Sequence, residues 1–185
     1  MDELTSLARA AGRGDRAALA AFIRQTQGDV WRFCAHLVDP AVADDLAQET
    51  YLRAIPALSR FRGDAPVRSW LLTIARRACA AEIDTRLKSR ELSARLAAES
   101  VTGPSSVPEP AGQATVGLLL DALDTDRRAA FVLTQMIGCS YAEAAAICRC
   151  PVGTIRSRVA RARADLDDML AEQGEPATAR LQQKI

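Results

Sequence analysis

The stretch Ser140–Arg163, SYAEAAAICRCPVGTIRSRVARAR, decides how the chain folds. Ser140 followed by Glu143 forms a capping box, because the serine oxygen can accept an N–H of the first turn while the glutamate reaches back to the serine N–H. A helix is therefore predicted to start there. Proline needs no N–H in the first turn of a helix, so a second helix is predicted from about Pro151 or Val152. Two short helices joined by a tight turn are typical of a helix-turn-helix.

The second predicted helix is strongly basic. Its arginines, with no acidic residue among them, are Arg156, Arg158, Arg161 and Arg163. Small or branched apolar residues that let the two helices cross closely are Ala144, Ala145, Ile147, Ile155 and Val159. We therefore expect the arginines to face outward, toward a phosphate backbone and the base edges of a major groove.

Length and composition favour an all-helical protein with one large or two small domains. The chain has 185 residues, aromatic residues make up only 4% of them, and β-branched runs are short. The sequence has no signal-peptide stretch and no run of about eighteen apolar residues, so we expect a cytoplasmic protein without a membrane span.

The cysteines do not suit a disulfide framework, because their number is odd and they are scattered through helical patterns. They are Cys34, Cys79, Cys139, Cys148 and Cys150. We expect most of them to be small core residues in a reducing compartment. The last three, together with His36, can in principle hold zinc, but no C-x-x-C pair is present and packing is the favoured interpretation. No metal and no cofactor are predicted, and His36 is expected to be a half-buried structural residue.

The formal net charge of +1 conceals a segregation of charge along the chain. Residues 60–95 contain nine basic and four acidic side chains, a net charge of +5. Acidic residues gather instead at positions 39–49 and 165–175. This pattern predicts one surface for a polyanion and another for a protein partner.

Apolar periodicity and turn residues divide the chain into two parts. Helices are predicted over residues 4–13, 17–38 with a potential break near Gly28, 42–57, 69 to about 95, 114–123 and 124–135. Residues 61–66, FRGDAP, are predicted to form a loop. Residues 100–113 are rich in proline, glycine and serine, which is typical of a linker. The prediction is an all-α chain of two small helical domains, 1–97 and 114–171, with a flexible linker at 98–113 and a polar tail at 172–185.

The order of these parts resembles the extracytoplasmic-function (ECF) class of bacterial RNA polymerase sigma factors, over nearly the whole chain. The segments that carry the resemblance are Gly14-Asp15 with Ala18, Asp44–Ala54 (DDLAQETYLRA), Phe61–Asp64 (FRGD), Ser69–Arg76 (SWLLTIAR) and Pro151–Arg158 (PVGTIRSR). The resemblance implies that residues 1–97 are sigma domain 2 and residues 114–171 are sigma domain 4. It also implies a transcription initiation factor that is not an enzyme and has no catalytic residues.

The resemblance implies that the helix at 44–54 docks on the clamp helices of the largest polymerase subunit. The candidate contacts are Asp45, Gln48, Glu49 and Arg53. Carboxylates and amides at helical spacing suit a partner that supplies arginines. For an isolated acidic helix a solvated face is the commoner explanation, and the flanking motifs reverse that preference.

The loop at 61–66 and the helix after it resemble the part that recognises the minus-ten element and holds the opened strand. The candidates are Phe61, Arg62, Asp64, Arg68, Trp70, Arg76 and Arg77. Opening a duplex costs about 1.4 kcal/mol per base-pair step, so unstacked bases need new partners. Aromatic faces and guanidinium planes supply them. Trp70 also lies on the apolar stripe of its helix, so core packing and DNA contact are equally compatible with its position.

The helix that begins near Pro151 resembles the part that recognises the minus-thirty-five element. The candidates are Thr154, Arg156, Ser157, Arg158 and Arg161. Arg156 and Arg161 suit guanine edges or phosphates, and Thr154 lies near the positively polarised start of the helix. For Arg158 and Arg163, a solvated position is as good an explanation as a contact with DNA.

Three positions depart from the family pattern. Arg77 stands where many relatives carry an amide, in the region of the pocket for a flipped base. Arg149 stands where many relatives have a glycine near the turn, and Ala160 is small where some have a larger contact residue. We therefore expect base preference and docking angle to differ from those relatives.

The partners that the resemblance implies are core RNA polymerase and promoter DNA. The first domain would bind the clamp helices, and the second would bind upstream duplex and the flap of the second-largest subunit. A linker of about fourteen residues has a mean span of roughly 20 Å, which permits both contacts. The complementary acidic and basic segments also predict either an anti-sigma protein or an autoinhibitory contact between the two domains.

Two other kinds of protein remain as alternatives. A stand-alone helix-turn-helix regulator of the response-regulator type would need a receiver domain, and residues 1–97 show no strand-length β-branched runs. An adaptor that binds polymerase without contacting DNA would have no use for the arginine-rich helix.

Overall fold

The computed structural model of the protein describes residues 2–99 and 116–172, and every regular element within these ranges is helical. The all-α prediction is confirmed. The linker was predicted at 98–113 and the tail at 172–185, but residues 98–99 belong to the last turn of a helix and Glu172 ends another. The rest of both segments lies outside the described residues.

The amino-terminal lobe is built from four helices and two short 3-10 turns. In chain order they are α1 (Glu3–Gly12), α2 (Arg16–Leu37), η1 (Pro40–Val42), α3 (Ala43–Ala57), η2 (Leu58–Arg60) and α4 (Val67–Glu99). Asp15 starts α2, since its carboxylate accepts the Ala18 N–H at 3.0 Å. The predicted break near Gly28 is wrong, because α2 runs without interruption through that position.

Large apolar side chains of these helices fill the centre of the lobe. Phe22 and Phe33 of α2 and Leu71 of α4 are fully buried, and each contributes about 1.5–3 kcal/mol of burial free energy. α1 also lies close against the turn after α3. A Cβ placed on Gly12 would be 2.5 Å from the Leu58 carbonyl oxygen, so this contact requires glycine.

The carboxy-terminal lobe contains the predicted helix-turn-helix. Its elements are α5 (Val116–Asp121), α6 (Thr125–Phe131), a π-helical turn η3 (Val132–Met136), α7 (Tyr141–Cys148) and α8 (Val152–Glu172). The capping box at Ser140 is confirmed, with Glu143 accepting the Ser140 N–H at 2.8 Å. The helix predicted over 124–135 is divided, because its last turn is π-helical.

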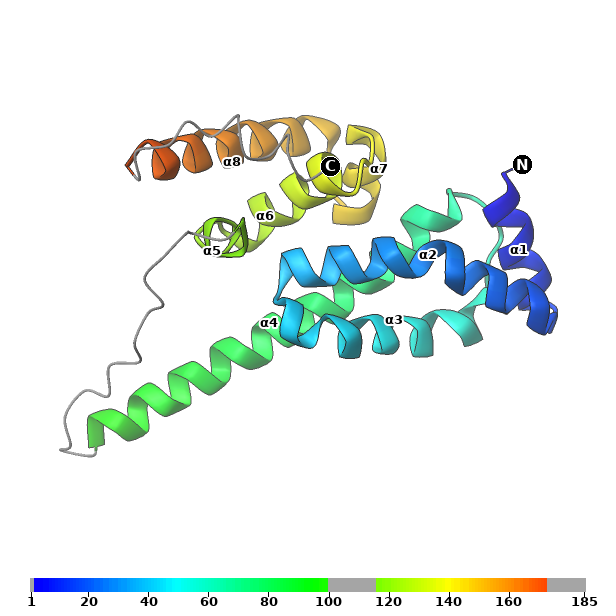
Figure 1. Ribbon diagram of the computed structural model, residues 1–185, viewed down its shortest axis with the longest axis horizontal. Coiled ribbons are helices and arrows are strands. Elements are labelled where there is room, and N and C mark those ends of the chain that lie inside the picture. Colours follow the sequence, from blue (N-terminus) through cyan, green and yellow to red (C-terminus); the bar gives the residue numbers. More distant parts are fainter. Residues whose placement is uncertain (1, 100–115, 173–185) are drawn as a thin grey trace.

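The two lobes pack against each other as two layers of helices (Figure 1). α4 lies against α7, and α2 lies against the π turn and α6. The buried apolar cluster continues from one lobe into the other. The predicted contact between the two domains is therefore present in this structure.

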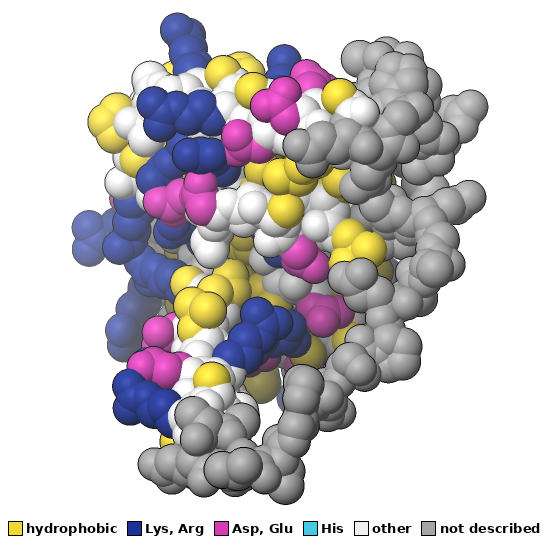
Figure 2. Space-filling view, turned by 90° about the vertical axis from the view of Figure 1, so that its left-hand side faces the viewer, with side chains coloured by type: hydrophobic (Ala, Val, Ile, Leu, Met, Phe, Trp, Pro, Cys, Tyr) yellow, Lys and Arg dark blue, Asp and Glu magenta, His cyan; other side chains and the backbone are white. Residues whose placement is uncertain are grey.

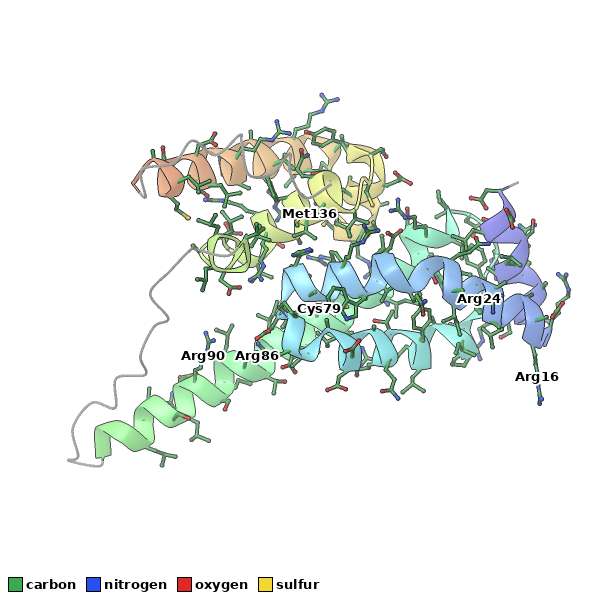
Figure 3. All side chains as sticks on the ribbon, viewed as in Figure 1. Arg16, Arg24, Cys79, Arg86, Arg90 and Met136 are labelled. Carbon is green, nitrogen blue, oxygen red and sulfur yellow. The ribbon has the colours of Figure 1, made fainter. Side chains whose placement is uncertain are left out.

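The carboxyl end of α4 projects beyond the bundle (Figure 1). Arg86 and Arg90 lie along this stretch (Figure 3). Ion pairs at i, i+4 spacing run along it, such as Asp84 with Lys88 at 2.7 Å and Glu91 with Arg95 at 2.5 Å. Such exposed pairs add only about 0.3–0.5 kcal/mol each to helix stability.

Candidate functional surfaces

The helix-turn-helix presents one face of α8 to solvent. Ile155 and Val159 of α8 are buried against the rest of the lobe, as the spacing predicts. On the opposite side Arg156, Ser157 and Arg161 are exposed, while Thr154 is half-buried. Within the described ranges neither Arg156 nor Arg161 forms an ion pair, so both guanidinium groups can bind an external anion.

Arg158 does not face outward as expected. It forms an ion pair with Asp126 of α6, and its side chain is only 23% exposed. Arg163 donates to the Gln135 side-chain oxygen at 2.6 Å. Only part of the predicted arginine face is therefore available for DNA in this structure.

The predicted loop at 61–66 and the start of α4 form a second candidate surface. The rings of Phe61 and Trp70 lie 5.2 Å apart and are tilted by 48°. Both are half-buried, so Trp70 packs on one side and reaches solvent on the other. Arg62 and Asp64 are exposed on the loop between the two rings.

The arginines of α4 divide between solvent and the other lobe. Arg77 is exposed. Arg68 pairs with Asp29 at 2.7 Å and donates to the Ile137 carbonyl oxygen at 2.6 Å. Arg76 lies 3.3 Å from the Asp126 carboxylate. The structure thus brings two predicted minus-ten residues into the contact between the lobes.

Asp126 is shared between the two predicted DNA surfaces. One of its oxygens is paired with Arg76 of the amino-terminal lobe and the other with Arg158 of α8. A carboxylate here occupies both arginines in the way a phosphate would. Figure 2 shows Lys and Arg side chains along one edge of the molecule, with acidic side chains set among them.

The predicted polymerase-binding helix α3 presents a mixed face. Asp45 and Gln48 are exposed, and Glu49 pairs with Arg53 at 2.5 Å. Leu52, which was not among the predicted contacts, is 66% exposed and follows Gln48 by one turn. Helical periodicity is the signal that could have identified it, because Leu52 lies off the buried line of α3, which is formed by Ala43, Leu46, Thr50 and Ala54.

Arg128, which was not among the predicted site residues, holds the two lobes together. Arg128 of α6 is 8% exposed, pairs with Asp121, and donates to the carbonyl oxygens of His36 at 2.6 Å and Val38 at 3.4 Å. These carbonyls lie at the carboxyl end of α2, where backbone oxygens lack helical partners and a cation is favoured.

His36 and the cysteines behave as packing residues, as predicted. Burial, together with Arg128 and Arg32, holds the pKa of His36 below its usual 6.5. Burial raises the pKa of the Cys139 and Cys148 thiols to about 11. These thiols therefore stay protonated at neutral pH, which suits small apolar core residues.

Two sequence models of known domains match this chain. Sigma-70 region 2 matches residues 22–87, and Sigma-70, region 4 matches residues 114–166. The first covers α3 and the candidate loop at 61–66, and the second covers the helix-turn-helix. The matches therefore coincide with the surfaces described above.

Full-length relatives agree with these matches. A probable RNA polymerase sigma-C factor of Mycobacterium bovis is 47% identical over 177 residues, which cover 95% of this chain and 93% of the relative. The ECF RNA polymerase sigma-E factor of Escherichia coli K12 is 31% identical over 170 residues, 84% of this chain and 88% of the relative.

Solved structures show the same arrangement of helices. CnrH in complex with the cytosolic domain of CnrY superposes with a TM-score of 0.72 at 27% identity, covering 92% of this chain and 99% of that one. The sigma factor RpoE of Bartonella quintana, in complex with the anti-sigma factor NepR, gives 0.63 at 28% identity, covering 83% and 96%.

The fold and the two domain matches define a transcription initiation factor of the sigma-70 type. Within that type, the chain belongs to the ECF RNA polymerase sigma factors, and it directs promoter-specific transcription. A match to region 2 disfavours the stand-alone regulator. Among the described helices, none has the length and apolar character needed to cross a membrane.

Proposed function

We propose that this sigma factor divides its work among three surfaces on two lobes. The exposed face of α3 binds core polymerase, the loop at 61–66 with α4 captures the opened minus-ten strand, and α8 recognises the minus-thirty-five duplex. One observation carries the proposal: the acidic and apolar face of α3 and the arginine face of α8 belong to different lobes. Because this sigma factor works with RNA polymerase, we infer that it acts in the cytoplasm.

The chemistry of α3 suits a protein partner. Asp45, Gln48 and Leu52 follow one another along the same side of the helix, at spacings of three and four residues. An exposed leucine flanked by a carboxylate and an amide provides an apolar anchor with a polar rim. Glu49 and Arg53 pair with each other here, and both can exchange that exposed pair for charges on the largest polymerase subunit at little cost.

The minus-ten surface combines stacking groups with cations. Phe61 and Trp70 are half-buried with their rings in contact, and Arg62, next to Phe61 in the chain, is exposed. A base stacked on such a group contributes about 1–3 kcal/mol, which offsets the stacking lost when the duplex opens. Arg77 is exposed on α4 and can hold the displaced backbone.

The minus-thirty-five surface combines base contacts with phosphate contacts. Arg156 and Arg161 reach the major groove when the start of α8 enters it, and a bidentate arginine–guanine pair discriminates by about 1–3 kcal/mol. Thr154 lies in the first turn of α8, where a phosphate oxygen is favoured by the helix dipole.

The docked arrangement of the lobes supports an autoinhibited free protein. Arg68 and Arg76 are engaged by the other lobe, and Arg158 is engaged by Asp126 within its own lobe. We propose that polymerase and promoter DNA displace these contacts. RpoE of Bartonella quintana binds the anti-sigma factor NepR, and we propose that this chain likewise takes an anti-sigma partner, together with or in place of the contact between lobes.

Reconstituted transcription tests the division of labour. Core polymerase with this protein is expected to start RNA synthesis at specific sites in a genomic promoter library, and core alone is not. Arg156→Ala is expected to lower promoter selection about tenfold with little loss of core affinity, and Glu49→Ala to do the reverse. Arg16→Ala, at the far end of α2 (Figure 3), and Glu91→Ala, on the projecting end of α4, are the matched controls.

Equal effects of Arg156→Ala and Glu49→Ala on core affinity would contradict the separation of surfaces. Failure of the unsubstituted protein to confer start-site choice would refute the proposed function as a whole.

A further inference from the structure

Arg149, at the turn of the helix-turn-helix, adopts a backbone conformation that arginine rarely takes. Its φ is 55° and its ψ is 46°, in the left-handed region. Among the described residues it is the one non-glycine with positive φ, whereas the other such positions are Gly14, Gly63 and Gly138. The backbone function of Arg149 is to end α7: its N–H bonds to the carbonyls of Ala145 and Ala146. Glycine performs that function without strain.

Among the described residues, no interaction of the Arg149 side chain offsets this backbone strain. The side chain is exposed, and within the described part of the chain no ion pair or side-chain hydrogen bond involves it. A cation at the carboxyl end of a helix gains some dipole stabilisation, but lysine or arginine elsewhere in the last turn gains it equally. Strained residues that persist without an internal reason are concentrated at functional sites.

The position of Arg149 in the helix-turn-helix indicates what its side chain contacts. In a helix-turn-helix the first helix crosses the sugar–phosphate backbone and the start of the second enters the major groove. Arg149 ends α7 and precedes the start of α8 at Val152 by three residues. A long flexible cation at that turn therefore projects toward the backbone strand that borders the groove, not toward base edges.

We propose that Arg149 is a phosphate-contacting residue that positions α8 on the minus-thirty-five duplex. The inference rests on the proposed function of α8 and adds a residue to it. Arg156 and Arg161 carry sequence preference, and Arg149 fixes the depth and angle at which they enter the groove. The unfavourable backbone conformation is the cost of placing this guanidinium at the turn.

Salt-dependent binding of the full-length protein to a random-sequence 25-bp duplex tests the proposal. Arg149→Gly and Arg149→Asn both suit positive φ and remove the charge. Each is expected to weaken binding about fivefold at 50 mM KCl and to make the slope of log Kobs against log [KCl] shallower by about 0.9, the effect of one phosphate contact. Arg149→Lys should keep the slope.

A thermal measurement separates this function from a structural one. Because glycine relieves the strain, Arg149→Gly is expected to raise the Tm by about 2–4 °C while it weakens DNA binding. Arg13→Gly is the matched control, since Arg13 also ends a helix and is exposed, but its φ of −91° is ordinary. Arg13→Gly should not raise the Tm, and it should leave the slope of log Kobs against log [KCl] unchanged.

Two outcomes would overturn the proposal. If Arg149→Gly and Arg149→Asn bind the duplex with the slope of the unsubstituted protein, Arg149 is only a helix terminator. If Arg156→Ala leaves unchanged the preference of the protein for promoter duplex over random-sequence duplex, the proposed function of α8 fails instead. If docked lobes keep the full-length protein from binding duplex, the same variants are measured in the Arg128→Ala background, and absence of duplex binding there would overturn both.

Discussion

Replacing Arg128 by alanine should release the two lobes from each other. Arg128 belongs to α6, and it is the buried cation that reaches into the amino-terminal lobe. It donates to the His36 carbonyl oxygen at 2.6 Å and more weakly to that of Val38 at 3.4 Å. Alanine removes both hydrogen bonds and leaves the end of α2 without its cation.

The size of the effect follows from these two bonds. A hydrogen bond to a charged group contributes about 1.5–3 kcal/mol, and the longer one lies at the weak end of that range. The ion pair with Asp121 adds little, because the Asp121 side chain is 54% exposed. A total of about 3 kcal/mol corresponds to a fall of roughly 150-fold in the docking equilibrium constant.

Small-angle scattering of the full-length protein measures this change. Arg128→Ala is expected to give an extended scattering profile and two separable unfolding transitions where the unsubstituted protein gives one. Arg127→Ala is the matched control: Arg127 is adjacent on α6 but pairs within its own lobe, with Asp124 at 2.8 Å and Asp165 at 2.6 Å. Superimposable scattering curves for Arg128→Ala and the unsubstituted protein would refute the reasoning, as would equal opening by Arg127→Ala.

Three further predictions concern stability. Ser140→Ala removes the cap of α7 and should cost about 1 kcal/mol in urea unfolding, provided that circular dichroism shows the fold intact. Gly12→Ala would place a Cβ 2.5 Å from the Leu58 carbonyl oxygen and should cost about 1–3 kcal/mol; an unchanged midpoint would refute the close contact. Because burial and Arg128 lower the pKa of folded His36 below 6.5, the folded state resists its protonation, so stability should fall as pH drops below about 6.5. His36→Gln should flatten that part of the pH profile, and an identical profile would contradict this assignment.

Sequence reasoning succeeded where the deciding interactions are local. Asp15 and Ser140 bond to N–H groups three residues away, so the helices that they cap could be placed from the sequence. The loop at 61–66 was equally visible, because glycine and proline act on their own neighbourhood. The family motifs then assigned these elements to sigma domains.

The interactions that sequence reasoning missed join distant residues. Arg128 contacts carbonyls about ninety positions away, and nothing near it in the sequence marks it as buried. Arg158 was expected to face outward because apolar residues were assigned to the contact between the two helices, yet it pairs with Asp126 of another helix.

The contact between the lobes combines two kinds of interaction that differ in their sensitivity to salt. Arg76 pairs with Asp126, and Arg68 donates to the Ile137 carbonyl oxygen; both arginine side chains are partly exposed, 26% and 32% accessible. Each of these contacts therefore contributes little to docking and is screened by salt. The Arg128 contact is buried and insensitive to salt. Salt alone should therefore leave the lobes docked. A DNA strand differs from salt because it binds the same arginines with several linked phosphates at once, so it removes the Arg68 and Arg76 contacts together and stabilises the open form. On this argument the contact resists changes in ionic strength and yields to DNA held in place by polymerase, which suits a factor that must stay closed until both are present.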